Sequence, residues 1–453
     1  KSFPLYATSS AGIMRVIKRR GLKYKMELLS DVVVIGGGPA GMMAAGRAAE
    51  CGHSVLLLEK NKSLGKKLLL TGGGRCNLAN NPSGKLETGI LDTRAILAKY
   101  KDSSQFLFSA FSQFGVKDTL KFFNERGVET KEEAEGRVFP VSNKAQSVLD
   151  ALVKYMKEGG VKIITNAAAK DLSIDKITKD INLRLKDGAE IIASACIVAT
   201  GGISYPETGS TGEGFDWLKK LGHKIIDNDF ALVPIALKDE WAKKLSGLAL
   251  KEIRLSVFLN GQKQKSFGKQ EGKILFTHFG ASGPTILNMS KDIGELLTAG
   301  EVVIGLDLFP KLDHGAFKQK LQTLLVAESN KKIKNTLGKI IPSALASGLL
   351  EIADINGETA NHSVKSEERT RLVALMKDIP LHIEGLLGAD KAIVSSGGVS
   401  LEEVNFKTMQ SRLIPNIYIV GDALNVNRPS GGYSLQLCWT TGFVAGNAIG
   451  DRI

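Results

Sequence analysis

A cluster of glycines near the start of the chain has the spacing needed to bind the diphosphate of a dinucleotide. Gly36, Gly38 and Gly41 form a G-x-G-x-x-G pattern, and Glu59 lies 23 residues after Gly36. The first glycine permits a tight turn, the second lets a diphosphate approach the backbone, and the third lets a helix pack against a strand. Glu59 can accept hydrogen bonds from ribose hydroxyls and would repel a 2′-phosphate. The pattern therefore predicts a site for FAD or NAD, and not for NADP.

The residues around this pattern predict the strand, turn and helix that it requires. Residues 31–35 (DVVVI) form a short apolar, β-branched run, which is typical of a buried parallel strand. An Ala-rich helix follows from Gly41 to about Cys51, and a second strand over 54–58 ends at Glu59. The N-terminus of such a helix presents unpaired N–H groups and a positive dipole to phosphates.

Two later segments resemble motifs of two-dinucleotide-type flavoproteins. Residues 196–202 (CIVATGG) are predicted to form a buried strand that ends in an A-T-G turn. Residues 416–420 (NIYIV) are predicted to form another strand, which is followed by Gly421 and Asp422. The resemblance implies that Asp422 binds the ribityl and phosphate region of a flavin. Both segments favour FAD over NAD.

A third segment, residues 428–446 (RPSGGYSLQLCWTTGFVAG), is predicted to begin a helix after Gly431 and Gly432. The amides at the start of this helix can hold the electron-rich pyrimidine edge of a flavin ring, because a helix N-terminus favours negative charge. The three segments together narrow the predicted cofactor to FAD.

From about residue 30 to its C-terminal end, the chain resembles the BaiN/YhiN-type NAD(P)/FAD-dependent oxidoreductases, which include proteins described as aminoacetone oxidase-like. Four further runs carry the resemblance: 65–77 (GKKLLLTGGGRCN), 204–212 (SYPETGSTG), 276–284 (FTHFGASGP) and 394–399 (VSSGGV). Two positions depart from the family pattern, with Gln410 in place of an acid and Ser434 in place of Asn. Both departures concern hydrogen bonds at the flavin edge and not the identity of the cofactor.

These motifs predict an α/β fold: a two-dinucleotide-type Rossmann-like FAD-binding domain with an inserted small β-barrel-like domain and a helical subdomain. The middle of the chain carries no nucleotide motif. It alternates like short strands over 223–310, and it is Lys-rich with a helical pattern over 315–375. The predicted parts are a basic, unstructured extension (1–28), the FAD-binding domain (29–204 and 390–453), the barrel-like insert (205–314, with a return strand in 376–389) and the helical subdomain (315–375).

The predicted cofactor contacts lie in these motifs and in the lysines beside them. They are Gly36, Gly38, Pro39, Ala40, Gly41, Glu59, Lys60, Lys67, Thr71, Gly72, Gly74, Arg75, Cys76, Asn77, Thr200, Gly201, Gly421, Asp422, Gly431, Gly432, Tyr433, Ser434 and Leu435. No second G-x-G-x-x-G pattern occurs, so NAD(P)H would bind transiently beside the flavin as the reductant. No metal site is predicted, because the histidines lack ligand spacing and the four cysteines are far apart.

Four residues are candidates for catalysis, each with a plainer alternative. Cys76 is either a proton donor beside the flavin or a small residue packed against the ring. Arg75 either offsets the negative charge of reduced flavin or makes a phosphate or structural contact. His278 either faces a cleft or is a buried structural histidine. Tyr433, like Tyr205, either donates a hydrogen bond from its hydroxyl or only packs.

The net charge of +13 is unevenly distributed. Residues 1–25 carry seven basic and no acidic side chains, which leaves 13 − 7 = +6 for the remaining chain. That mild excess fits an anionic cofactor or an anionic substrate such as RNA. The basic N-terminal segment is either an extension without structure or an organelle transit peptide. We expect a cytoplasmic protein without stable membrane association, with organelle import as the alternative.

Three hypotheses about function follow. The first is reduction of a C=C bond in an organic substrate by NAD(P)H through FAD. For this reaction the resemblance implies substrates that range from small steroid-like molecules to uridine in ribosomal RNA. The second is an oxygen-dependent amine oxidase, as the aminoacetone oxidase name implies. The third is a flavin-binding interaction protein without turnover of its own. The oligomeric state is left open.

Overall fold

The computed structural model describes residues 5–9, 12–17, 25–82, 93–226, 230–231, 233–261, 266–388, 394–395 and 397–450. The chain divides into two compact units. The first unit contains Lys1–Asp229 and Val394–Ile453, and the second contains Phe230–Ile393. The first unit thus contains both ends of the chain, as the distribution of the nucleotide motifs predicts.

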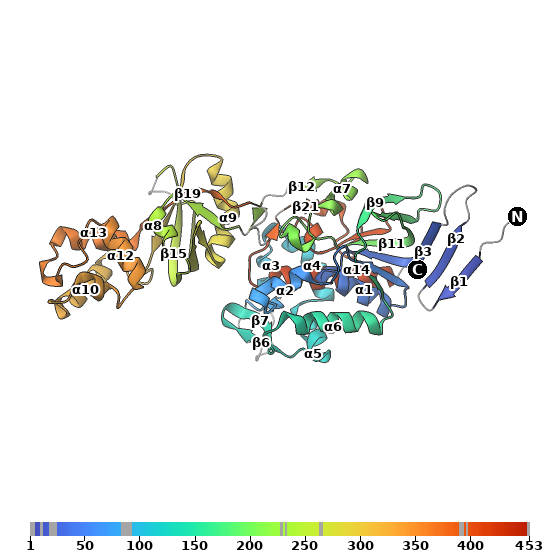
Figure 1. Ribbon diagram of the computed structural model, residues 1–453, viewed down its shortest axis with the longest axis horizontal. Helices are drawn as coiled ribbons and strands as arrows, with labels where there is room; N and C mark the ends of the chain where they lie inside the picture. The colour runs from blue at the N-terminus through green and yellow to red at the C-terminus, as the bar shows by residue number, and fades with distance from the viewer. Residues whose placement is uncertain are drawn as a thin grey trace. The chain divides into compact units, whose positions relative to one another are not determined.

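A parallel sheet forms the centre of the first unit (Figure 1). Its strands lie in the order β8 (Lys162–Ile164), β4 (Val55–Leu58), β3 (Lys25–Ile35), β11 (Glu190–Val198) and β22 (Ile417–Ile419). All four residues of β4 are buried, as are Val32–Ile35 of β3. Continuous burial of Val, Ile and Leu is the pattern expected of parallel strands that are covered on both faces.

The carboxyl ends of these strands are in register. Ile35 pairs with Leu58 and Val198, Leu58 pairs with Ile164, and Val198 pairs with Ile419. The backbone therefore leaves the five strands at one level of the sheet. Ligands bind at this edge of open α/β sheets.

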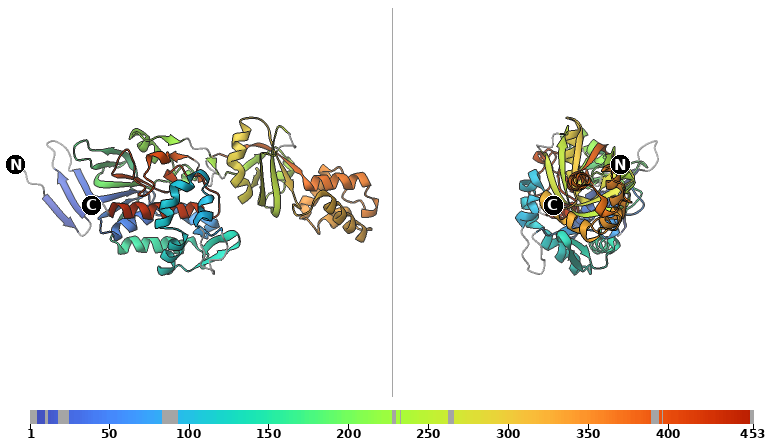
Figure 2. Two further views of the ribbon diagram at one scale, coloured as in Figure 1. Left: turned by 180° about the vertical axis from the view of Figure 1, so that it is seen from behind. Right: turned by 90° about the vertical axis from the view of Figure 1, so that its left-hand side faces the viewer.

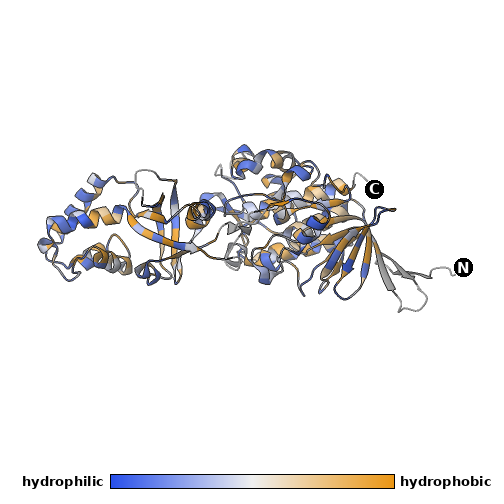
Figure 3. Cartoon of the chain, turned by 90° about the horizontal axis from the view of Figure 1, so that it is seen from above, coloured by the Kyte–Doolittle hydropathy of each residue, from blue (hydrophilic) through white to orange (hydrophobic). Residues whose placement is uncertain are grey.

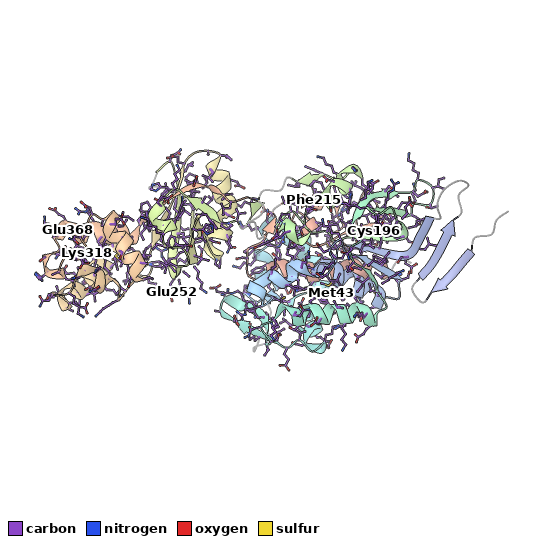
Figure 4. All side chains as sticks on the ribbon, in the orientation of Figure 1. Met43, Cys196, Phe215, Glu252, Lys318 and Glu368 are labelled. Atoms are coloured by element: carbon purple, nitrogen blue, oxygen red, sulfur yellow. The ribbon has the colours of Figure 1, made fainter. Side chains whose placement is uncertain are left out.

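Two helices from opposite ends of the chain, α1 (Pro39–Glu50) and α14 (Tyr433–Gly450), lie side by side in the first unit (Figures 1 and 2). Glycines permit the close approach. A Cβ atom at Gly442 would lie 2.5 Å from the Ala40 carbonyl oxygen, and one at Gly446 would lie 2.6 Å from the Ala44 carbonyl oxygen. Met43 of α1, which is labelled in Figure 4, is fully buried.

The remaining elements of the first unit extend this core. Antiparallel strands continue the sheet beyond β11 and beyond β3. They are β10 (Ile181–Leu185), β9 (Ala169–Ile174), β2 (Gly12–Ile17) and β1 (Leu5–Ser9). In place of the predicted unstructured extension, the described part of residues 1–28 consists of β1, β2 and the start of β3, because their backbones pair in sequence.

A small sheet and several helices complete the first unit. The sheet consists of β5 (Ala79–Asn80), β7 (Arg137–Pro140) and β6 (Thr130–Glu133). The helices are α2 (Lys66–Leu70), α3 (Thr93–Ala98), α4 (Ser104–Gln113), α5 (Val116–Glu125), α6 (Ala145–Glu158) and α7 (Glu213–Lys220).

The second unit contains a closed barrel of six strands, which confirms the predicted barrel-like insert. Around the barrel the order is β14 (Ile235–Leu237), β17 (Gly280–Ser282), β16 (Gly268–Thr277), β15 (Ala249–Leu259), β18 (Val302–Asp307) and β19 (Ile379–Leu386). Helix α9 (Pro284–Leu297) follows β17, and the short α8 (Glu240–Lys243) follows β14.

The helical subdomain lies between β18 and β19 in the sequence, and it is confirmed as well. It consists of α10 (His314–Ala327), α11 (Ile333–Leu337), α12 (Ser343–Ile352) and α13 (Ser366–Lys377). In Figure 3 its helices carry both polar and apolar segments. A buried ion pair joins it to the barrel, because the Lys377 ammonium donates to Asp307 at 2.7 Å and to the Phe309 and Leu312 carbonyls at 2.8 and 2.6 Å.

The division between the units follows residue 229, whereas the sequence placed the boundary after residue 204. The segment in between packs into the first unit. Phe215, Trp217 and Leu218 of α7 are buried in the hydrophobic core of that unit (Figure 4 labels Phe215). The backbone of 225–226 also pairs with 398–399 as strands β12 and β21.

We expect Gly442→Ala to destabilise the first unit by about 1–3 kcal/mol, because the added methyl group would meet backbone that cannot rotate away. Gly348→Ala in α12 is the matched control. Its added Cβ would lie 3.7 Å from the Trp241 ring, and Ala favours a helix by about 1 kcal/mol. Urea unfolding followed by Trp fluorescence measures both changes. Equal stability of the two variants would contradict this account of the packing between α1 and α14.

Candidate cofactor-binding site

A groove runs along the carboxyl edge of the parallel sheet in the first unit. The residues that directly follow four of the strands, Gly36, Glu59, Ala199 and Val420, all line it. The groove holds about 920 Å³ of space outside atoms, including its open mouth.

The glycines of the first motif have the geometry that diphosphate binding requires. Gly36 has φ of 112°, and a Cβ on it would overlap the carbonyl oxygen of Ala199. A Cβ on Gly41 would overlap the carbonyl oxygen of Gly36. A Cβ on Gly38 would meet no atom within 4 Å, because Gly38 faces open space at the N-terminus of α1. That space is where a diphosphate would meet the first amides of the helix.

Glu59 is held in place by its own surroundings and is 8% exposed. One carboxylate oxygen accepts a hydrogen bond from the Gly37 amide at 2.8 Å. The other accepts two from Asn61, from the backbone amide and the side-chain amide, both at 2.7 Å. The carboxylate is therefore fixed against the glycine turn in the groove, as a ribose-binding acid must be.

Two predicted lysines line the groove in different electrostatic settings. Lys60 donates to Glu213 at 2.7 Å and to Thr211 at 2.8 Å. Burial tends to raise the pKa of Glu213, but hydrogen bonds from Lys60 and Lys186 lower it. Lys67 donates to the Ser204 carbonyl at 2.7 Å. Burial lowers the pKa of Lys67, and the nearby Asp422 opposes this shift.

Asp422 lines the groove and forms an ion pair with Arg428. The Arg428 guanidinium is buried, and it also donates to the Val426 carbonyl at 2.8 Å and to the Ser434 hydroxyl at 3.0 Å. Arg428 thereby ties the predicted flavin-binding acid to the first turn of α14. Ser434, where the family pattern has Asn, serves here as the acceptor for Arg428.

The other predicted contacts form a second cluster, made of residues 71–77 and 431–435. None of these residues lines the groove, but the two segments touch each other. A Cβ on Gly432 would overlap the Ala79 carbonyl oxygen and lie 3.0 Å from the Asn77 side-chain oxygen. Arg428 joins this cluster to the groove. The structure therefore brings both sets of predicted contacts into one unit.

Cys76 is fully buried and does not line the groove. Its amide donates to the Thr71 carbonyl at 2.9 Å, and its own φ is 62°. Burial raises the pKa of the thiol to about 12. These features match the plainer alternative, a small packed residue, better than an exposed proton donor.

The Arg75 side chain contacts residues of the small sheet. It forms an ion pair with Glu133 and donates to Asn143 at 3.0 Å and 2.7 Å, and its guanidinium lies 4.1 Å from the centre of the Phe139 ring. The hydrogen bond from Arg75 lowers the pKa of Glu133. These contacts correspond to the structural alternative for Arg75.

The last two candidates, Tyr433 and His278, belong to different units. Tyr433 is buried at the start of α14, and its hydroxyl donates to Asn80 at 2.9 Å. His278 lies in the second unit, in the turn between β16 and β17, where it is exposed and contacts the Phe279 ring edge to face. His278 is therefore not a buried structural histidine.

An observation that does not depend on the motif also indicates that the groove binds a dinucleotide. The hydroxyl of Thr200, which lines the groove, is buried and has no hydrogen-bond partner among the described residues. Buried hydroxyls are almost always bonded, so this one indicates a partner supplied by a ligand. The open space at Gly38 supplies the matching cradle for a diphosphate. Within the described part of the chain, no group of His, Cys, Asp or Glu side chains could hold a metal ion.

Several residues at the site were missed from the sequence. Asn61 fixes Glu59, Arg428 fixes Asp422, and Asn80 fixes Tyr433. Each lies within or beside a motif: two residues after Glu59, just before Gly431-Gly432, and just after Cys76-Asn77. Motif position was the available signal; of the three pairings, only that of Asn80 with Tyr433 joins residues that are distant in the sequence.

Comparisons with known proteins agree with this geometry. A family model described as the HI0933-like protein Rossmann domain matches residues 30–448. A 3-dehydro-bile acid delta(4,6)-reductase of Clostridium scindens is 30% identical over 427 residues, which cover 94% of this chain and 100% of that protein. A ribosomal RNA dihydrouridine synthase of Escherichia coli is 28% identical over 413 residues, which cover 91% and 96% of the two chains.

The fold also matches a solved structure. The 3-ketosteroid delta1-dehydrogenase of Sterolibacterium denitrificans superposes with a TM-score of 0.54 over 94% of this chain and 100% of that one. At 13% identity this match concerns the fold alone. The resemblance to BaiN/YhiN-type proteins is confirmed by the family model and the relatives. The chain belongs to the HI0933-like family of flavin-dependent oxidoreductases.

Proposed function

We propose that the protein binds FAD non-covalently and uses NAD(P)H to reduce a C=C bond in a ring of its substrate. The observation that carries the proposal is that residues from both ends of the chain, among them Gly38, Glu59 and Asp422, converge on one groove. The flavin-binding motifs occupy this groove and its neighbouring cluster, and no second dinucleotide motif is present in the sequence.

The chain's own residues would hold and orient the cofactor. The first amides of α1 would bind the diphosphate, Glu59 the adenosine ribose, and Asp422 the ribityl chain. Lys60 and Lys67 place positive charge beside the diphosphate. Bound FAD supplies two-electron redox chemistry, and the protein positions the substrate and manages protons.

The proposed substrate chemistry rests on the two relatives. Both names describe saturation of a C=C bond in a ring, in a bile acid or in an RNA uridine. A reductase for small ring compounds or for ribosomal RNA would use the same cofactor site. Within the described residues, no helix has the length and apolarity needed to cross a bilayer. We propose a cytoplasmic location.

Anaerobic mixing of the purified yellow protein with NADH and with NADPH tests the reductant. We expect one nucleotide to bleach the flavin absorption, and a ring enone or ribosomal RNA lacking dihydrouridine to restore it faster than oxygen does. Rapid reoxidation by oxygen with release of peroxide would support an amine oxidase in its place. Failure of both nucleotides to reduce the flavin would exclude the proposed reductant.

We expect Glu59→Gln to weaken FAD binding about tenfold, because a neutral amide replaces charge-assisted hydrogen bonds at the ribose, a change of about 1.4 kcal/mol. Quenching of flavin fluorescence during titration measures the dissociation constant. Glu158→Gln on the exposed face of α6 is the matched control and should bind FAD as the wild type does. Unchanged affinity of the Glu59 variant would show that this carboxylate does not contact the cofactor.

We expect Cys76→Ala to retain turnover within about threefold and to leave the pH profile unchanged. The raised pKa, about 12, keeps the Cys76 thiol protonated throughout the neutral range, so its ionisation cannot produce a change in rate between pH 6 and 9. Steady-state rates across that range are the measurement. Loss of turnover with intact FAD binding would restore Cys76 as the proton donor.

A further inference from the structure

One side chain, Asn80, holds both sides of the turn that precedes α14. Asn80 lies at the end of β5 and is 5% exposed. Its amide nitrogen donates to the Gly431 carbonyl at 2.8 Å and to the Glu135 carbonyl at 3.2 Å. Its amide oxygen accepts the hydroxyl hydrogen of Tyr433 at 2.9 Å. A single amide therefore fixes residues before and after Gly432.

The turn needs such restraint because of its backbone. Gly431 and Gly432 have φ of 109° and 105°, and two adjacent glycines have a large conformational freedom to lose. A Cβ on Gly432 would overlap the Ala79 carbonyl oxygen, so the turn passes directly against β5. Side-chain bonds to a fixed strand are the available means of holding it in one conformation.

Two further contacts hold the first turn of α14 itself. The Tyr100 hydroxyl, which is fully buried, donates to the Tyr433 carbonyl at 2.8 Å. Arg428 donates to the Ser434 hydroxyl at 3.0 Å. These contacts hold the N-terminus of the helix on several sides without any ligand, and its free amides stay available to bind one.

The Tyr433 hydroxyl is poorly suited to proton transfer. Its hydrogen is directed at Asn80, and burial raises the pKa of Tyr433 to about 12. A general acid must have its proton within reach of the reacting group and not committed elsewhere. The same hydrogen bond does suit a fixed structural link.

We propose that Asn80 and Tyr433 are positioning residues that fix the N-terminus of α14 against the electron-rich edge of the bound FAD ring, and that Tyr433 is not the proton donor. This inference rests on the proposed function. A rigid helix N-terminus stabilises the negative charge that the ring gains on reduction, because its dipole is already oriented. Loosening the turn therefore disfavours the reduced cofactor.

The test compares Tyr433→Phe and Asn80→Ala with Tyr155→Phe as the matched control. Tyr155 also donates one hydroxyl hydrogen bond, to Glu50 at 2.7 Å, and it does not line the groove. Two readouts are needed: hydrogen exchange, in the ligand-free protein, of the first hydrogen-bonded amides of α14, beginning with the Gln436 amide that donates to the Gly432 carbonyl at 3.1 Å, and the midpoint potential of the FAD-loaded protein.

We expect both variants to exchange these amides at least tenfold faster and to lower the midpoint potential. A tenfold smaller ratio of reduced to oxidised cofactor corresponds to about 30 mV for a two-electron couple. The control should match the wild type in both readouts. If Asn80→Ala does not fold, Asn80→Asp takes its place. The aspartate still accepts the hydrogen bond from Tyr433 but cannot donate to the Gly431 carbonyl, so faster exchange is expected in this variant too.

Unchanged exchange and potential in Tyr433→Phe would overturn the proposal. Loss of turnover at unchanged potential would also overturn it, by making Tyr433 the proton donor. Failure of the wild type to bind FAD would instead refute the proposed function, and the exchange rates would still show whether Asn80 and Tyr433 fix the turn.

Discussion

The register of the parallel strands is the constraint on which the cofactor site depends. Ile35, Leu58, Val198 and Ile419 end their strands at one level, so the backbone that follows each strand opens into the same groove. A slip by one residue in any strand would reverse which face each side chain occupies and would move Glu59 or Asp422 out of position.

The second requirement is close approach between backbones, which small residues supply. Gly41 lets α1 pack on the glycine turn, while Gly442 and Gly446 let α14 pack on α1. These contacts join the beginning and the end of the chain into one unit. The first turn of α14 thus belongs to the same unit as the groove that the first motif opens, and Arg428 links the two through Asp422 and Ser434.

Much of the fold could be predicted from the sequence because local patterns encode it. Short-range signals alone predicted the first elements. The apolar run at 31–35 predicted a strand, the glycine motif a turn, and Glu59 the end of a second strand. The barrel and the helical subdomain also followed from alternation and family resemblance. The boundary of the insert could not be predicted, because α7 belongs to the first unit through buried contacts of Phe215 and Trp217 that no local pattern shows.

The roles of individual site residues were predictable only in part. Arg75 and Cys76 were candidates for catalysis because of their residue types. In the structure, Arg75 binds Glu133 and Asn143, and Cys76 is completely buried. Asn80 was overlooked because its partner, Tyr433, is distant in the sequence. Arg428 lies only six residues from Asp422 and from Ser434, but in a loop without a regular spacing that would predict these contacts. Pairings of this kind arise only when the tertiary fold forms.

The location of β22 and α14 at the end of the chain has a consequence for biosynthesis. A ribosome releases the glycine turn and Glu59 first, and the 164 residues of the second unit follow before β22 can pair with β11. β11 must therefore wait for its neighbour β22 while residues 199–416 are synthesised. The complete groove therefore forms only after residues 417–422 have been synthesised, and a nascent chain that stops before them carries an intact nucleotide motif without Val420 and Asp422 of the groove.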